Sequence, residues 1–192
     1  MPDPNPAALD FLETRRSRLA KTLTAPGPDR DTLRRILTAA VRVPDHGKLE
    51  PWRLIVLEGR ALARLADTAS ARAEALGFEP ERVEKTAAMF RTAPLIVAVV
   101  SAPRAHDKIP DIEQILSAGA LCLGLLNAAQ ALGWGGNWLT GPMAGDAAFL
   151  KEALDVDTPD FVAGFMVLGS ETTPPKERPR PDLDAMTAWV DA

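Results

Sequence analysis

An arginine-rich segment near the N-terminus could bind an anion. It reads RRSR and supplies Arg15, Arg16 and Ser17. Two guanidinium groups and a hydroxyl suit a cluster of anionic oxygens, because arginine presents its N–H donors as a rigid fork. The segment follows a helix that Asn5 as cap and Pro6 in the first turn predict, and that should end near Arg15 or Arg16. The alternative is favourable basic charge at a helix C-terminus.

A ten-residue loop, VPDHGKLEPW at positions 43–52, holds more functional groups than a simple connection needs. His46 could donate a proton, stack on a ring or donate a hydrogen bond. The alternative is an exposed loop histidine, and we interpret Lys48 and Glu50 as solvated charges. Trp52 begins an apolar strand and is expected to pack in the core.

A third segment, ALGWGGNWLTG at positions 131–141, could lie against a flat ligand. Its glycines would let the backbone approach closely. Trp134 and Trp138 offer stacking area, and Thr140 offers a hydroxyl. The alternative is a helix C-cap at Gly133 followed by a tight turn.

Hydrophobic periodicity predicts the elements that position these segments. Helices are expected over residues 29–43, 60–91 (two helices broken at Gly77), 113–132 and 145–154. Strands are expected over residues 52–59, 93–101 and 160–170, with a turn and a strand in 135–141. Helices and strands do not alternate strictly, which predicts an α+β fold with helices flanking a sheet. We expect one domain over residues 1–192, with a proline-rich tail from about residue 171.

Composition and charge exclude several classes of function. The net charge of -4 does not support nucleic-acid binding. The N-terminus lacks the pattern of a secretory signal. The longest apolar stretch, residues 115–136, contains polar residues and several glycines, so it predicts a buried helix rather than a membrane span. We therefore expect a cytoplasmic protein.

The chain also lacks the usual signatures of a self-sufficient catalytic centre. His46 and His106 show no metal-ligand spacing with each other or with Cys122, so no metal site is expected. Cys122 lies in an apolar run and is expected to pack rather than to attack a substrate. No dinucleotide-binding glycine motif, P-loop or nucleophile elbow occurs. Such a chain could take its chemistry from an organic cofactor.

The three segments together resemble the FMN-dependent nitroreductase family. An early RRS, a proline-tryptophan loop feeding a strand, and a small-residue helix running into ALGWGGNW occur there in the same order. The similarity covers roughly residues 9–170 and is closest to the short, single-domain YdjA-like minimal branch. It implies a central, mostly antiparallel sheet flanked by helices, in an intertwined homodimer with FMN at the interface.

The resemblance also implies which residues bind the cofactors. The residues that match FMN-binding positions are Arg15, Arg16, Ser17, Arg42, His46, Trp138, Leu139 and Thr140, with Arg42 and His46 expected from the partner subunit. The segment that matches the nicotinamide-binding positions is Ala128, Ala129, Gln130, Ala131, Leu132 and Gly133.

One departure from the family pattern and the basic tail lead to further expectations. Many members carry a basic residue where this chain has Leu19, so Arg42 is a candidate for the positive charge near N1 and O2 of the reduced flavin. The tail could supply Lys176, Arg178 or Arg180 to the phosphate.

The function implied is an NAD(P)H oxidoreductase that reduces nitroaromatic, quinone or similar electron-poor acceptors. Hydride transfer would be ping-pong, through flavin N5, in a slot lined from residues 60–91. The catalytic side chains are unknown, because solvent can supply protons; His46 is a candidate donor. The alternatives are another flavin chemistry on this scaffold (dehalogenation, flavin destruction or unsaturated-bond reduction), a flavin-binding or delivery protein with little turnover, and an α+β interaction domain that binds no flavin.

Overall fold

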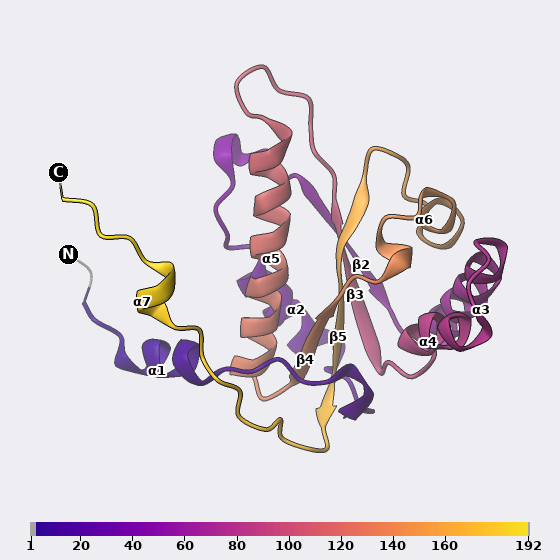
Figure 1. The fold of residues 1–192 in the computed structure, drawn as a ribbon, viewed down its shortest axis with the longest axis horizontal. Helices are drawn as coiled ribbons and strands as arrows, with labels where there is room; N and C mark the ends of the chain where they lie inside the picture. Colours follow the sequence, from indigo (N-terminus) through magenta and orange to yellow (C-terminus); the bar gives the residue numbers. More distant parts are fainter. Residues whose placement is uncertain (1–2, 192) are drawn as a thin grey trace.

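Five strands form the centre of the structure, and every pairing between them is antiparallel (Figure 1). The computed structural model describes residues 3–191. Strand β5 (Phe161–Glu171) lies in the middle and pairs on one edge with β3 (Leu95–Ser101), which pairs in turn with β2 (Trp52–Leu57). Its other edge pairs with β4 (Gly135–Leu139), and the C-terminal end of β5 pairs with the short β1 (Leu23–Thr24). The expected mostly antiparallel sheet is confirmed.

Helices cover both faces of this sheet, and the expected α+β class is confirmed. One face packs against α2 (Arg30–Ala40) and α5 (Asp111–Ala131). The other packs against α3 (Arg60–Ala75), α4 (Pro80–Arg91) and α6 (Ala147–Leu154), as Figure 1 shows.

The central strands are apolar because both of their faces are covered. All seven residues of β3 are buried, as its continuous apolar run predicts. Under α3, α4 and α6, the ring of Phe90 meets the edge of Phe165 with centroids 5.1 Å apart and tilts against Phe149 at 5.7 Å. These contacts anchor α4 and α6 to β5, so the loop between β4 and α6 is held against α4.

Local sequence signals explain most helix boundaries. The Asn5 side chain accepts a hydrogen bond from Ala8 N at the start of α1 (Pro6–Thr14), as its cap position predicts. The second helix ends at Ala40, three residues earlier than the expected Val43. Because the residue before a proline avoids the helical region, the chain leaves the helix before reaching Val43 and Pro44.

The remaining described elements lie at the margins of the two layers. Three short 3-10 helices are η1 (Ala20–Thr22), η2 (His46–Lys48) and η3 (Pro142–Ala144), and α7 (Leu183–Met186) interrupts the C-terminal tail. Both α1 and the tail extend beyond the sheet and its helices in Figure 1.

Helix α5 is long and apolar enough to cross a membrane by length and composition alone. In the structure one side of it packs on the sheet, where Leu121 and Leu125 are fully buried. Its outward side exposes Ile112, Leu116 and Leu123, which are spaced four and seven residues apart and therefore form one apolar stripe.

Candidate functional site

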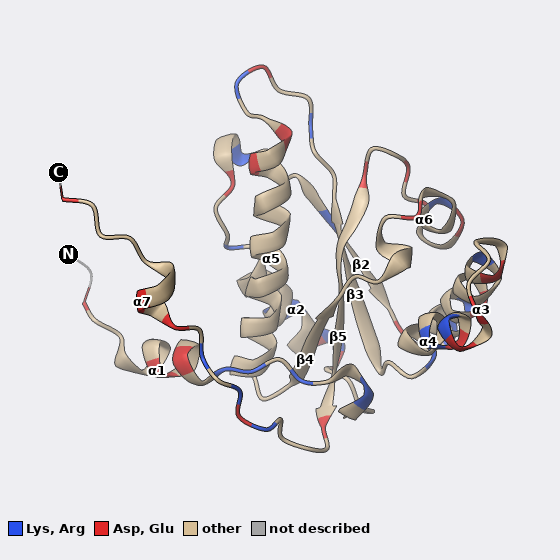
Figure 2. Ribbon diagram, viewed as in Figure 1, with Lys and Arg blue, Asp and Glu red and all other residues tan. Residues whose placement is uncertain are grey.

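The arginine segment that follows α1 and the C-terminal tail meet in one cavity. Its volume is about 360 Å³, and its lining residues are Arg15, Arg16, Ser17, Arg178, Pro179, Arg180 and Pro181. Figure 2 shows Lys and Arg on both segments at the lower edge of the molecule. We call the four arginines and Ser17 the arginine cradle. Of the three tail cations expected from the sequence, Lys176 does not line this cavity.

Backbone hydrogen bonds hold the cradle between α5 and β4. Arg16 N donates to Oε1 of Gln130 at 3.2 Å, near the last turn of α5. Arg18 N donates to the carbonyl of Gly136 at 2.9 Å, and the Asn137 side chain donates back to the carbonyl of Arg18. The anion-binding groups therefore sit beside the first residues of β4.

Arg15 of the cradle is surrounded by other cations. Burial, followed by repulsion from Arg18, Arg180 and Arg16, lowers the pKa of Arg15. The Nε of Arg15 is buried and has no hydrogen-bond partner within residues 3–191. A buried donor without an acceptor is costly, so a bound anion with several oxygens would satisfy this group and relieve the repulsion.

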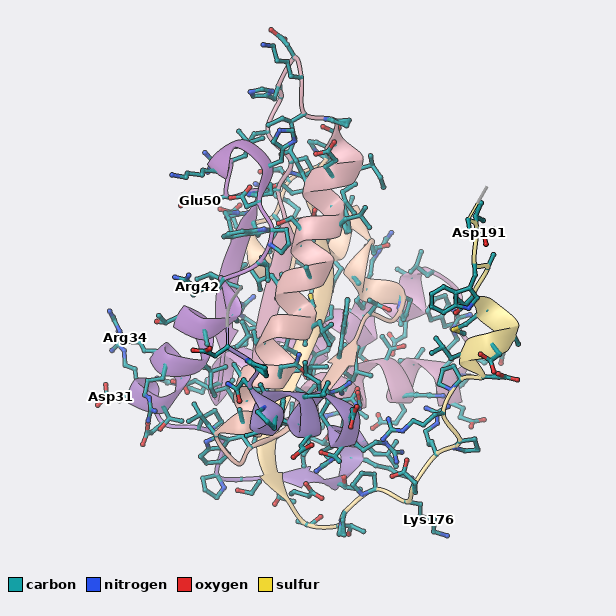
Figure 3. All side chains as sticks on the ribbon, turned by 90° about the vertical axis from the view of Figure 1, so that its left-hand side faces the viewer. Asp31, Arg34, Arg42, Glu50, Lys176 and Asp191 are labelled. Atoms are coloured by element: carbon teal, nitrogen blue, oxygen red, sulfur yellow. The ribbon has the colours of Figure 1, made fainter. Side chains whose placement is uncertain are left out.

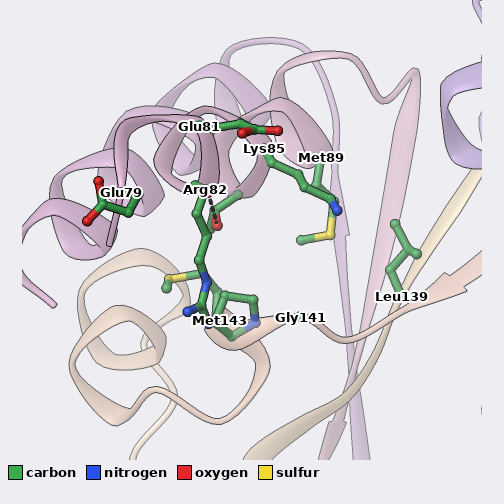
Figure 4. A pocket seen from close by; sticks show the side chains of 10 residues that line it. Glu79, Glu81, Arg82, Lys85, Met89, Leu139, Gly141 and Met143 are labelled. Atoms are coloured by element: carbon green, nitrogen blue, oxygen red, sulfur yellow. Dashed lines mark hydrogen bonds between the residues drawn. The ribbon is translucent and has the colours of Figure 1, made fainter. Parts of the chain in front are cut away.

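A second, larger cavity lies at the other end of β4 (Figure 4). Its volume is about 660 Å³, within the usual range for small-molecule sites. It is lined from α4 and from the segment after β4 by Glu79, Glu81, Arg82, Lys85, Thr86, Met89, Leu139, Gly141, Pro142 and Met143. Residues 60–91 were expected to line the slot for hydride transfer, and residues 79–89 of this region line the cavity beside the end of β4.

Strand β4 connects the two cavities, and beyond Gly136 its outer edge pairs with no other strand of residues 3–191; we call this its free edge. Because Gly136 offers its carbonyl to Arg18, away from β5, the N–H and C=O of Trp138 also point away from β5. Gly136 and Leu139 are about 10 Å apart along the strand. A molecule with an anionic end and a flat end could lie along this edge, with its anion in the arginine cradle.

The predicted residues Trp138, Leu139 and Thr140 lie together at this end of β4 but face different surroundings. Leu139 lines the larger cavity and Thr140 is exposed. The Trp138 indole lies on the α5 face, where its Nε1–H donates to the carbonyl of Ala163 at 2.9 Å. It packs over Gly164, where a Cβ would come within 2.5 Å of Nε1.

The glycines of this segment serve packing and the end of α5. A Cβ on Gly135 would meet Leu23 at 2.4 Å, and one on Gly136 would meet Leu126 at 2.9 Å. Gly133 has φ +83° and forms the helix C-cap that the sequence offered as the alternative. The space that a side chain would occupy at Gly135 and Gly136 is therefore filled by Leu23 and Leu126 of the chain itself.

The loop residues expected in the same site lie far from the cradle within one chain. Nδ1 of His46 is 2.8 Å from Glu113 at the start of α5, whereas Arg16 contacts Gln130 near its end. These two positions are 17 residues apart, or about 26 Å along the helix. Arg42 is exposed at the end of α2, and Figure 3 shows it on a different side from Lys176 of the tail.

The segment expected to bind a nicotinamide cofactor forms the C-terminal end of α5. Ala129 is fully buried, and Gln130 is the one side chain among residues 128–133 with hydrogen-bonding groups. Its Nε2 is buried without a hydrogen-bond partner in the described part of the chain. Cys122 is also buried, and burial raises its thiol pKa to about 12, so it packs as expected.

Comparisons with known proteins bear directly on this site. The profile of the nitroreductase family matches residues 12–170. A Haemophilus influenzae protein named "Putative NAD(P)H nitroreductase" is 37% identical over 164 residues, which are 85% of this chain and 88% of that protein. The Escherichia coli K12 protein named "Putative NAD(P)H nitroreductase YdjA" is 36% identical over 164 residues, 85% and 87% of the two chains.

Solved structures show the same fold. The nitroreductase-like family protein from Bacillus cereus superposes with a TM-score of 0.81 at 20% identity and covers all of both chains. A Desulfovibrio desulfuricans structure in complex with FMN superposes with a TM-score of 0.74 at 24% identity, over 99% of this chain and 100% of that one.

Proposed function

The chain belongs to the nitroreductase family, and from that premise we propose that it is an FMN-dependent NAD(P)H oxidoreductase acting on nitroaromatic, quinone or similar electron-poor acceptors. The observation that carries this proposal is the arginine cradle beside the free edge of β4, since it offers an anion site joined to a flat-ligand site. The dependence on NAD(P)H is proposed because the names of the two relatives given above include NAD(P)H.

The residues fit an FMN molecule by their chemistry. Arg15, Arg16 and Ser17, with Arg178 and Arg180, would hold the phosphate through charge-assisted hydrogen bonds. When bound, FMN would supply the redox chemistry by taking a hydride from NAD(P)H and passing two electrons to the acceptor. The chain itself would orient the cofactor, with an apolar wall at Leu139 and Met143.

A homodimer would complete each site. His46 pairs with Glu113, about 26 Å along α5 from the Gln130 that holds Arg16, so His46 and Arg42 would act on the FMN held mainly by the partner. The apolar stripe of Ile112, Leu116 and Leu123 on α5 would be covered by the second copy.

We also propose roles for other parts of the chain, based on its membership of the nitroreductase family. The cavity wall formed by α4 would select the acceptor, and residues 128–133 would contact the nicotinamide cofactor. His46 could donate a proton from the partner. The protein would act in the cytoplasm as one FMN-binding domain over residues 1–192.

The experiment that tests this function is a visible absorption spectrum of the freshly purified protein, followed by release and identification of the chromophore. We expect one FMN per chain, and anaerobic bleaching of the flavin bands when NADH or NADPH is added. A protein that binds FMN but is not reduced by either nucleotide would favour a flavin carrier. A colourless protein that does not take up added FMN would contradict the proposal.

A further inference from the structure

The main chain of Arg16 is held on both sides by side chains that do not line the arginine cradle. Its N–H donates to Oε1 of Gln130 at 3.2 Å, and its carbonyl accepts a hydrogen bond from Nη1 of Arg18 at 2.9 Å. The cavity is lined by Arg16 itself but not by Arg18 or Gln130. These two residues therefore act on the anion site through Arg16.

The guanidinium group of Arg18 is fixed in turn by the sheet. Its Nε donates to Oε2 of Glu171, the last residue of β5, and the two side chains are only 21% and 25% exposed. The backbone N–H of Arg18 donates to the carbonyl of Gly136 at 2.9 Å, and its carbonyl accepts a hydrogen bond from the Asn137 side chain. Arg18 is thus attached to β4 by its main chain and to β5 by its side chain.

The arginine segment therefore contains two kinds of guanidinium group. Arg15 has a buried Nε without a hydrogen-bond partner within residues 3–191, and Arg16 pairs with the exposed carboxylate of Glu177. Arg18 instead uses its Nε and Nη1 inside the protein, on Glu171 and on the carbonyl of Arg16. Arg15 and Arg16 are thus suited to bind an anion, whereas Arg18 is suited to hold the segment in place.

Binding of a phosphate depends on the position of the Arg16 guanidinium, because charge-assisted hydrogen bonds require short distances and good alignment. We propose that Gln130 and Arg18, which is oriented by Glu171, are positioning residues that hold the main chain of Arg16 for phosphate binding. This inference rests on the proposed FMN function. It makes Glu171 an acid whose removal weakens the binding of an anion, the opposite of the effect of its negative charge alone.

The variant Glu171→Met separates this role from direct phosphate binding by Arg18. If Arg18 bound the phosphate, loss of the carboxylate would free a cation and remove a nearby negative charge, so FMN would bind more tightly. With Arg18 as a positioning residue, FMN should instead bind about tenfold more weakly, the scale of one lost hydrogen bond to a charged group. Glu171→Gln keeps an acceptor for Arg18 and should restore most of the affinity.

The experiment titrates flavin-free protein with FMN and with riboflavin, which lacks the phosphate, and follows flavin fluorescence. The ratio of the two dissociation constants isolates the contribution of the phosphate, whereas a general defect in folding weakens both ligands. The variants are Glu171→Met, Glu171→Gln, Arg18→Met, Gln130→Leu and the double variant Arg18→Met/Glu171→Met.

Two controls match these changes. Glu74→Met removes a carboxylate from the exposed surface of α3. Asn127→Leu removes an amide from α5 one turn before Gln130, and Oδ1 of Asn127 has no hydrogen-bond partner in the described part of the chain. Both controls should bind FMN as the wild type does.

Each outcome decides for or against the positioning role. Weaker FMN binding with unchanged riboflavin binding in Glu171→Met and Gln130→Leu supports it, as does a double variant no weaker than Arg18→Met alone. Tighter FMN binding in Glu171→Met would make Arg18 a phosphate ligand and overturn the proposal, and equal losses for both flavins would overturn it too. Either result would leave the FMN function intact, whereas a wild-type protein that binds neither flavin would remove that function itself.

Discussion

The carboxylate of Glu177 lies 3.1 Å from Nη1 of Arg16 and 3.4 Å from Nη2 of Arg180. A hydrogen bond from the backbone N–H of Arg178, together with the two guanidinium groups, lowers the pKa of this carboxyl. Glu177 is therefore ionised at neutral pH. It pairs with the arginines that we assign to the FMN phosphate, so the two anions compete for the same donors.

Replacing Glu177 with Gln should tighten FMN binding. The gain should be about two- to fivefold, the modest effect of removing one exposed ion pair, and it should shrink at high salt because exposed charges are screened. Titration of flavin-free protein with FMN measures it. Glu74→Gln, on the exposed surface of α3, is the matched control. Equal or weaker binding in Glu177→Gln would show that Glu177 does not compete with the phosphate.

Replacing Arg15 with Met should have opposite effects on the flavin-free and FMN-bound protein. Without FMN, the change removes a partly buried charge whose pKa is already lowered by burial and by neighbouring arginines, so the melting temperature should stay equal or rise. FMN binding should weaken at least tenfold, because a charge-assisted phosphate contact is lost. Thermal melts with and without FMN test both parts, since a ligand that binds only the folded state raises its stability. A variant that FMN stabilises as strongly as the wild type would exclude Arg15 from the site.

Local sequence signals predicted most of the fold. The cap at Asn5 and the break at Gly77 mark helix ends, and the apolar run at 93–101 predicted the buried strand that the structure has at Leu95–Ser101. The family resemblance is confirmed, and with it the antiparallel sheet. The two-residue strand β1 was not predicted, because a strand of that length has no periodicity to detect.

The candidate site was only partly accessible from the sequence. The arginine segment could be singled out because Arg15, Arg16 and Ser17 are contiguous. Its contact with Gln130 and with the tail depends on tertiary structure, and the position of Lys85 beside Leu139 joins residues more than fifty positions apart. No spacing rule relates such residues. The roles expected for Arg42 and His46 stay predictions.

The ion pair between Arg72 and Asp146 should make stability depend on pH in acid. Arg72 donates two hydrogen bonds to the carboxylate, at 2.8 and 2.9 Å, and thereby lowers the pKa of Asp146. A carboxyl with a lowered folded-state pKa stabilises the protein above its unfolded pKa, near 3.8, and loses this effect as the pH falls through the folded value.

Asp146→Asn should therefore lower the melting temperature at pH 7 by about 2–4 °C. Below about pH 4, where Asp146 of the wild type becomes protonated, the two melting temperatures should converge. The side chain of Asn can still accept the bond from Phe149 N that Asp146 now accepts at the start of α6, so the helix cap is retained. Melting curves over a pH series measure the effect. If the difference in melting temperature stays constant down to pH 2, the variant loses stability through altered packing rather than through the lost charge.

The separation of His46 from Arg16 along α5 predicts complementation between subunits. Arg15→Met/Arg16→Met should remove the cradle, and Arg42→Ala/His46→Ala should remove the loop contribution, so each homodimer should bind FMN weakly. A mixed dimer combines one intact cradle with one intact loop, because a two-fold dimer forms each site from both copies. Mixed dimers isolated with two different affinity tags should regain about half of the wild-type FMN content. If the mixed dimers regain no FMN although both variants are folded, the cradle and the loop serve different sites. Strong FMN binding by the Arg42→Ala/His46→Ala homodimer would show that Arg42 and His46 do not belong to the site.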